Sequence, residues 1–179
     1  VLDLRHVSEL LGQRAGERMR FLWSFMILTL RKPGVAARTI LLRQFPNEAI
    51  WTGLFLAVIL NALFFGVWGL IIPDSSQLAM FDMSPESPGL SLMISAFRSV
   101  LFAALLTFGG HWLGGSGHFM PILSLLVWDQ LLQLAVMGLG IVVLLISPAL
   151  GSMVFLIIGL VLFFVRLDFV NEAHGFASL

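Results

Sequence analysis

The sequence predicts an all-α, polytopic integral membrane protein: a helical bundle with four spans, preceded by interfacial amphipathic helices. Hydrophobic residues make up 59% of the 179 residues and charged residues 11%, whereas a soluble domain carries about 25% charge. Residues 131–165 contain no Asp, Glu, Lys, Arg or His. That stretch is longer than a single crossing, which needs about 20 apolar residues. Ser-Pro-Ala-Leu-Gly-Ser at 147–152 interrupts it, and such residues end one helix and begin the next.

The N-terminal segment, residues 1–48, is expected to lie at the membrane surface. Apolar residues at 21–28 are bracketed by Arg18, Arg20, Arg31 and Lys32, and a run of this length is too short to span. Residues 35–44 repeat the pattern between two prolines. Basic side chains beside a short apolar face favour an interfacial helix whose cations reach anionic headgroups. A dedicated partner-binding helix is the alternative interpretation.

The bundle is expected over residues 49–170, and each span is bounded by turn residues. The first span lacks charge and ends at Pro-Asp-Ser-Ser, where an acidic loop with Asp74, Asp82 and Glu86 begins. Gly-Gly-Ser-Gly-His at 114–118 separates the second span from the third, and the interruption at 147–152 separates the third from the fourth. The predicted spans are about 50–72, 90–113, 120–147 and 151–170.

Charge bias predicts the orientation. Most of the ten Lys and Arg residues lie within the first 50 positions, whereas the loop after the first span has acidic residues only. The positive-inside rule then places the N-terminus in the cytoplasm. Four crossings return the chain there, so residues 171–179 are expected to be a cytoplasmic tail. The turn at 114–118 should also be cytoplasmic, although it lacks Lys and Arg.

Polar side chains within the spans are the candidate site. Charge inside the hydrocarbon costs about 3 kcal/mol on insertion scales, so Arg98 and Asp129 are the first places to look for function. Helical rise places the two side chains at similar depth in antiparallel neighbours. The predicted layer consists of Asn61, Arg98, Asp129, Gln130 and Gln133. It is either a structural pair of Arg98 and Asp129 that tolerates burial through mutual satisfaction, the interpretation that we favour, or part of a substrate or proton pathway.

Other chemistries find little support. The chain has no cysteine, which excludes disulfides, thiolate metal sites and a cysteine nucleophile. The four histidines lack the i, i+4 spacing of a helical metal site. No phosphate loop, Ser-His-Asp grouping or paired carboxylate site is visible in the sequence. We therefore expect no metal, no cofactor and no enzymatic activity. A haem or chlorin ligand at His111 is the one cofactor alternative. A net charge of zero, with basic residues facing a membrane, argues against nucleic-acid binding.

Several short motifs in order resemble the Yip family, the Ypt/Rab-interacting membrane proteins, and in particular a small alphaproteobacterial type. They are Thr-Leu-Arg-Lys-Pro-Gly-Val-Ala-Ala-Arg at 29–38, Phe-Pro-Asn-Glu-Ala at 45–49, Gly-Gly-Ser-Gly-His-Phe at 114–119 and the ending at 169–176. The most specific residues are Glu172, His174, Gly175 and Phe176.

The resemblance implies a cytoplasmic N-terminus and five membrane helices, so we expect a fifth span to begin after residues 171–179. Eukaryotic relatives bind prenylated Rab GTPases in traffic between the endoplasmic reticulum and the Golgi, a role that does not transfer to bacteria. The resemblance supplies no catalytic residues. The expected location is the bacterial inner membrane.

The leading functional prediction is a non-enzymatic membrane scaffold or accessory subunit. Its partners would be membrane lipids and another integral membrane protein or complex. The alternative is a small transporter or channel that uses the layer of Arg98 and Asp129. A transporter requires a water-accessible path to Asp129, whereas a scaffold keeps that carboxylate dry.

Overall fold

The computed structural model describes residues 4–71 and 88–176, and these residues form helices and short connections without a strand. The helices are α1 (Leu4–Arg31), α2 (Pro33–Leu42), α3 (Asn47–Ile71), α5 (Pro88–Trp112), α6 (Phe119–Ile146) and α7 (Pro148–His174). In α3, α5, α6 and α7, the structure has four helices long and apolar enough to cross a membrane. The all-α, four-span prediction is therefore confirmed. The predicted acidic loop after the first span lies outside the described residues.

Helix boundaries follow the turn residues. Proline stands at the start of α2 and of α7, where its missing N–H costs nothing. The Ser147 hydroxyl accepts from Leu150 N–H at 3.5 Å and caps α7. Gly175 ends the same helix in the left-handed conformation, with φ 63°. Thus α7 continues to His174, beyond the predicted end at 170, and the first part of the expected tail is helical.

Helix α6 is the centre of the bundle. It contacts α2, α3, α5 and α7, and it separates two buried clusters of apolar side chains. One cluster, formed with α2 and α7, includes Leu125 and Leu132. The other, formed with α3 and α5, includes Leu123 and Leu126. Because both faces of α6 are covered by other helices, α6 has eight buried residues, whereas α7 has six.

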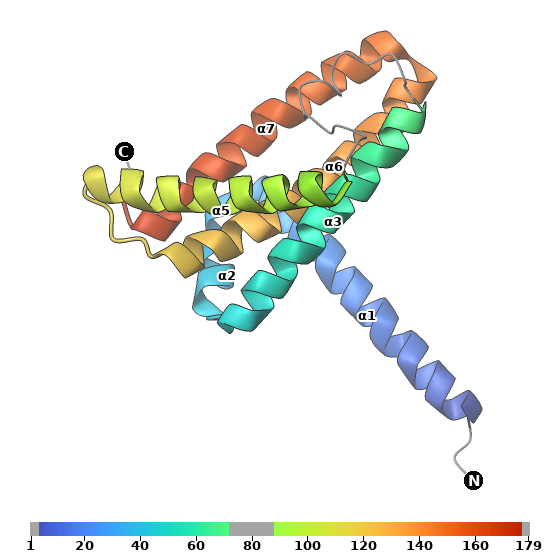
Figure 1. Cartoon of the computed structure of the whole chain (residues 1–179). Coiled ribbons are helices and arrows are strands. Elements are labelled where there is room, and N and C mark those ends of the chain that lie inside the picture. Colours follow the sequence, from blue (N-terminus) through green and yellow to red (C-terminus); the bar gives the residue numbers. More distant parts are fainter. Residues whose placement is uncertain (1–3, 72–87, 177–179) are drawn as a thin grey trace.

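The helix arrangement is visible in Figure 1, where α6 and α7 form a long antiparallel hairpin and α5 crosses the bundle. At the hairpin, a Cβ on Gly151 would overlap Leu144, so glycine is what allows α7 to approach α6 this closely. The N-terminal part of α1 (blue) projects away from the bundle. The C-terminal part of this helix lies against the bundle, where α1 contacts α2 and α7.

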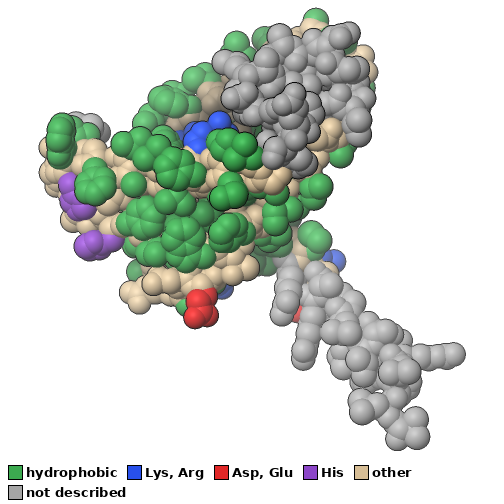
Figure 2. Space-filling view, viewed as in Figure 1, with side chains coloured by type: hydrophobic (Ala, Val, Ile, Leu, Met, Phe, Trp, Pro, Cys, Tyr) green, Lys and Arg blue, Asp and Glu red, His purple; other side chains and the backbone are tan. Residues whose placement is uncertain are grey.

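Most of the outer surface of the spans is apolar. Large hydrophobic side chains such as Phe97, Phe108, Leu156 and Phe163 are more than half exposed, and Figure 2 shows hydrophobic side chains (green) covering much of the visible face. A continuous exposed apolar surface of this kind is unfavourable in water and suits a hydrocarbon environment.

Candidate functional site

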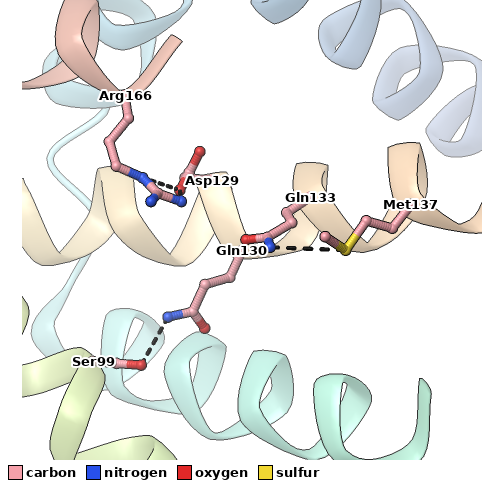
Figure 3. A network of polar contacts seen from close by, with 6 residues as sticks. All are labelled: Ser99, Asp129, Gln130, Gln133, Met137 and Arg166. Atoms are coloured by element: carbon pink, nitrogen blue, oxygen red, sulfur yellow. Dashed lines mark hydrogen bonds and ion pairs between the residues drawn. The ribbon is translucent and has the colours of Figure 1, made fainter. Parts of the chain in front are cut away.

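Asp129 on α6 forms an ion pair with Arg166 on α7, near the middle of the bundle. The Nε of Arg166 donates to Oδ2 of Asp129 at 2.9 Å, and Nη2 donates to the same oxygen at 2.5 Å. Figure 3 shows the guanidinium directed at that carboxylate. The Asp129 side chain is 1% exposed and that of Arg166 is 36% exposed. Oδ1 of Asp129 has no hydrogen-bond partner among the described residues.

The predicted partner of Asp129 was wrong. Arg98, not Arg166, was expected to pair with this carboxylate, but the ion pair is made by Arg166. Arg166 stands four residues before position 170, where the fourth span was predicted to end. Because α7 continues to His174, Arg166 lies about 12 Å inside the end of the helix. The sequence signal that could have identified Arg166 was its position, within four residues of the predicted end of the fourth span and two residues before Asp168.

The predicted polar residues nevertheless surround one cavity of about 350 Å³, between α3, α5, α6 and α7. Its lining includes all five residues of the predicted layer together with Arg166: Asn61, Arg98, Asp129, Gln130 and Gln133. We call this space the polar cavity. Ser95 and Ser99 of α5, which the sequence did not single out, also line it. Their position on the α5 face that carries Arg98 was the available signal.

Most amide groups around the polar cavity have partners. Gln130 Nε2 donates to Ser99 Oγ at 2.9 Å, which ties α6 to α5. Gln133 Nε2 lies 3.8 Å from the sulfur of Met137, and Asn61 Nδ2 donates to the backbone oxygen of Ala57 at 2.9 Å. These bonds, drawn in part in Figure 3, lower the cost of holding amides inside a membrane.

Arg98 differs from these amides, because the structure gives its charge no partner among the described side chains. Its side chain is exposed, and among the residues whose side chains the structure describes, no carboxylate forms an ion pair with it. Figure 2 shows basic side chains (blue) in a hollow surrounded by hydrophobic ones (green). The charged side chains that line the polar cavity are Arg98, Asp129 and Arg166, so the lining carries a net formal charge of +1.

A second polar cluster fixes the end of α7 to the turn between α5 and α6. His174 is 2% exposed. Its Nδ1 accepts from Gly117 N–H at 3.2 Å, and its Nε2 lies 3.1 Å from the backbone oxygen of Leu106. Since a carbonyl can only accept, Nε2 carries the proton and the ring is the Nε2–H tautomer. The backbone N–H of Ser116 also donates to the His174 carbonyl at 3.0 Å. We call this cluster the histidine clasp.

Glycines make room for the imidazole of the histidine clasp. A Cβ on Gly110 would overlap the His174 ring, and a Cβ on Gly115 or Gly117 would lie 2.6 or 2.7 Å from its atoms. Gly114 turns the chain with φ 85°, a conformation that side chains disfavour. The glycine-rich turn is therefore a socket for one side chain, rather than only a connection between spans.

A comparison with protein-family models shows to which family the chain belongs. The model of the Yip1 domain matches residues 27–179. The chain belongs to the Yip family. The match begins within α1 and includes the polar cavity and the histidine clasp, so both lie inside the Yip1 domain. No curated protein and no solved structure matches the chain. The predicted family is confirmed, and its alphaproteobacterial type stays a prediction.

In this Yip-family protein the four motif residues at the end of α7 have distinct contacts. Glu172 Oε1 accepts from Nε of Arg38 on α2 at 2.5 Å, and this contact raises the pKa of the Arg38 guanidinium. His174 forms the histidine clasp and Gly175 ends the helix. The ring of Phe176 stacks on that of His174, with 5.3 Å between centroids.

The other two histidines of the Yip1 domain, His111 and His118, do not form a ligand set with any of the described residues. His111 lies with its ring 6.0 Å from that of His174, centroid to centroid, and both its side chain and that of His118 are exposed. Within the part of the chain that the structure describes, no group of three or more His, Asp or Glu residues could hold a metal ion. A haem or chlorin at His111 stays an untested alternative.

Proposed function

We propose that this protein is a non-enzymatic scaffold or accessory subunit, which holds another integral membrane protein against the polar cavity. Its place would be the bacterial inner membrane, with the N-terminus in the cytoplasm. The supporting observation is Arg98, which is exposed at the cavity and lacks a carboxylate partner among the described residues. An unpaired cation within a span is unfavourable by about 3 kcal/mol on insertion scales. A polar or acidic side chain from a neighbouring helix would offset that cost.

The substitution Arg98→Gln tests the proposal. Membranes that contain the wild-type protein would be solubilised in mild detergent and separated by native electrophoresis. We expect a larger stoichiometric complex with the wild type and at least about tenfold less of it with Arg98→Gln, because a lost charge-assisted contact is worth about 1.5–3 kcal/mol. Mass spectrometry would identify the partner.

Two matched variants control this experiment. Arg98→Lys keeps the charge, and Leu101→Ala removes an exposed side chain on the same helix that does not line the polar cavity. Both should retain the complex. A wild-type protein that runs alone or as a homo-oligomer would contradict the proposed role. If the Arg98→Gln variant formed as much of the complex as the wild type, the polar cavity would not be part of the interface with the partner.

The polar cavity also favours one competing function, a small transporter or channel. Its half-open shape and its lining of amides, serines and charges could hold a hydrated solute. Because the chain has no cysteine, single cysteines can be introduced without a background. Under the scaffold proposal, Gln133→Cys in membranes should react with an impermeant thiol reagent far more slowly than Ser116→Cys in the exposed turn, since only a hydrated thiolate reacts. Equal rates would instead support transport.

A further inference from the structure

An apolar groove lies between the N-terminal helices and the bundle, away from the polar cavity. It has a volume of about 230 Å³ and is formed by α1, α2, the start of α3 and the first half of α6. Its lining includes Phe21, Phe25, Ile40, Arg43, Ile50 and Trp128. We call it the Arg43 groove.

Polar atoms in the wall of the Arg43 groove are already satisfied. Trp128 Nε1 donates to Thr29 Oγ1 at 3.1 Å, and the Thr29 hydroxyl donates to the backbone oxygen of Phe25 at 2.8 Å. Likewise, the hydroxyls of Thr39 and Ser124 donate to backbone oxygens of their own helices. The wall thus has few free donors for a peptide backbone or a sugar, and it favours an apolar occupant.

Arg43 supplies a cation at this groove. Its side chain is exposed, and its guanidinium carbon lies 5.7 Å from the centroid of the Phe21 ring. Arg43 is the C-cap of α2. Arg38 within α2 is paired with Glu172, but the side chains that the structure describes provide no carboxylate partner for Arg43. An arginine held over an aromatic face keeps its donors available for an anion, and its planar guanidinium suits the oxygens of a phosphate.

The position of the Arg43 groove along the helices indicates which class of anion could reach it. Ala49 and Ile50, in the first turn of α3, line it, as do Ser124 and Val127, which lie within the first turns of α6 after Phe119. Both helices enter the bundle at this end. With α3 and α6 as membrane spans, their first turns are expected at the membrane surface, where lipid phosphates meet the upper part of their acyl chains.

We infer that the Arg43 groove binds one anionic phospholipid, with part of an acyl chain along the apolar wall and the phosphate at Arg43. An apolar interior, a single unpaired cation and an interfacial depth together match an amphiphile with a negative head. Charge complementarity favours an anionic headgroup over a zwitterionic one, in which the ammonium offsets the phosphate. This lipid site does not depend on the proposed scaffold function.

Trp128 allows a direct test, because its ring lines the Arg43 groove. The full chain would be prepared with Trp128 as its single tryptophan, by replacing Trp23, Trp51, Trp68 and Trp112 with Phe. The variant would be placed in phosphatidylcholine vesicles with increasing phosphatidylglycerol whose acyl chains carry bromine, a contact quencher of tryptophan. The reverse series would carry bromine on phosphatidylcholine.

We expect brominated phosphatidylglycerol to quench Trp128 with an apparent affinity about fivefold above that of brominated phosphatidylcholine, the preference that one interfacial cation provides. Arg43→Gln should abolish the difference, while Arg31→Gln, an exposed arginine that does not line the groove, should keep it. Ala49→Phe should reduce quenching by both lipids by filling the groove. Equal quenching by the two lipids, a preference that survives Arg43→Gln, or a Trp128 that neither lipid quenches would each overturn the inference.

Discussion

Asp129→Ala is expected to destabilise the protein by about 3–5 kcal/mol, the cost of breaking a buried ion pair from one side. Asp129 is almost completely buried and accepts two donors from Arg166. Removal of its carboxylate leaves the guanidinium of Arg166 inside the bundle without a counter-charge among the described residues. The remaining contact of that guanidinium, 6.0 Å from the centroid of the Phe102 ring, is worth only about 0.5–2 kcal/mol.

Unfolding in detergent micelles, followed by circular dichroism against added denaturant, measures the effect of Asp129→Ala. The matched control is the double variant Asp129→Leu with Arg166→Leu. Since both charges are then absent, we expect it to be much more stable than the single variant, and close to the wild type. Comparison of the single and double variants separates the pair from the rest of the network. A midpoint for Asp129→Ala within error of the wild type would show that this pair does not hold α6 to α7.

Gly110→Ala is expected to cost about 3 kcal/mol, although it adds only one methyl group. The new Cβ would overlap the imidazole of His174, and overpacking of this kind costs about 1–3 kcal/mol. The ring cannot move aside freely, because Gly117 N–H and the Leu106 carbonyl hold its two nitrogens. Displacement of the ring would forfeit both bonds, at about 1 kcal/mol each.

The neighbouring glycine provides a control for Gly110→Ala. A Cβ on Gly109 would have nothing within 4 Å, so Gly109→Ala should be neutral or slightly stabilising through its better helix propensity. The combination of Gly110→Ala with His174→Ala should cost no more than His174→Ala alone, because the obstructing ring is gone. Thermal melts of all four variants in one detergent test this. Fully additive effects of Gly110→Ala and His174→Ala would refute the histidine clasp as the cause.

The spans of this protein could be predicted from local sequence, because each apolar run is bounded by residues with a known effect on the backbone. Proline at 148, after the serine at 147 that caps α7, fixes the α6–α7 hairpin whatever the rest of the chain does. Likewise, the absence of charge between residues 131 and 165 determines the environment of both helices.

The partner of Asp129 could not be predicted in the same way. Depth in the bilayer is one coordinate, and it placed Arg98 and Asp129 at the same level. Which cation reaches Asp129 depends on the rotation of each helix, and that rotation is set by packing of the two clusters around α6. The predicted end of the fourth span at 170 also drew attention away from Arg166, whereas the helix itself continues to His174.

The contacts of the histidine clasp could not be predicted from the sequence either, although its residues were noted there. A glycine-rich turn indicates free space and unusual backbone angles, but it does not indicate which side chain fills the space. His174 lies 57 positions from Gly117 and 68 from Leu106, and no local period connects them. The ending at 172–176 was singled out only through the family resemblance.

The histidine clasp has a consequence for the order in which the membrane protein assembles. Synthesis proceeds from the N-terminus, so the socket at residues 110–117 leaves the ribosome well before His174 does. Until α6 and α7 have both been inserted, the N–H of Ser116 and that of Gly117 lack the acceptors that they have in the finished fold. Contact between α5 and the end of α7 therefore requires that the α6–α7 hairpin has already been inserted. A chain stalled before that point would have a glycine-rich turn whose space no imidazole fills.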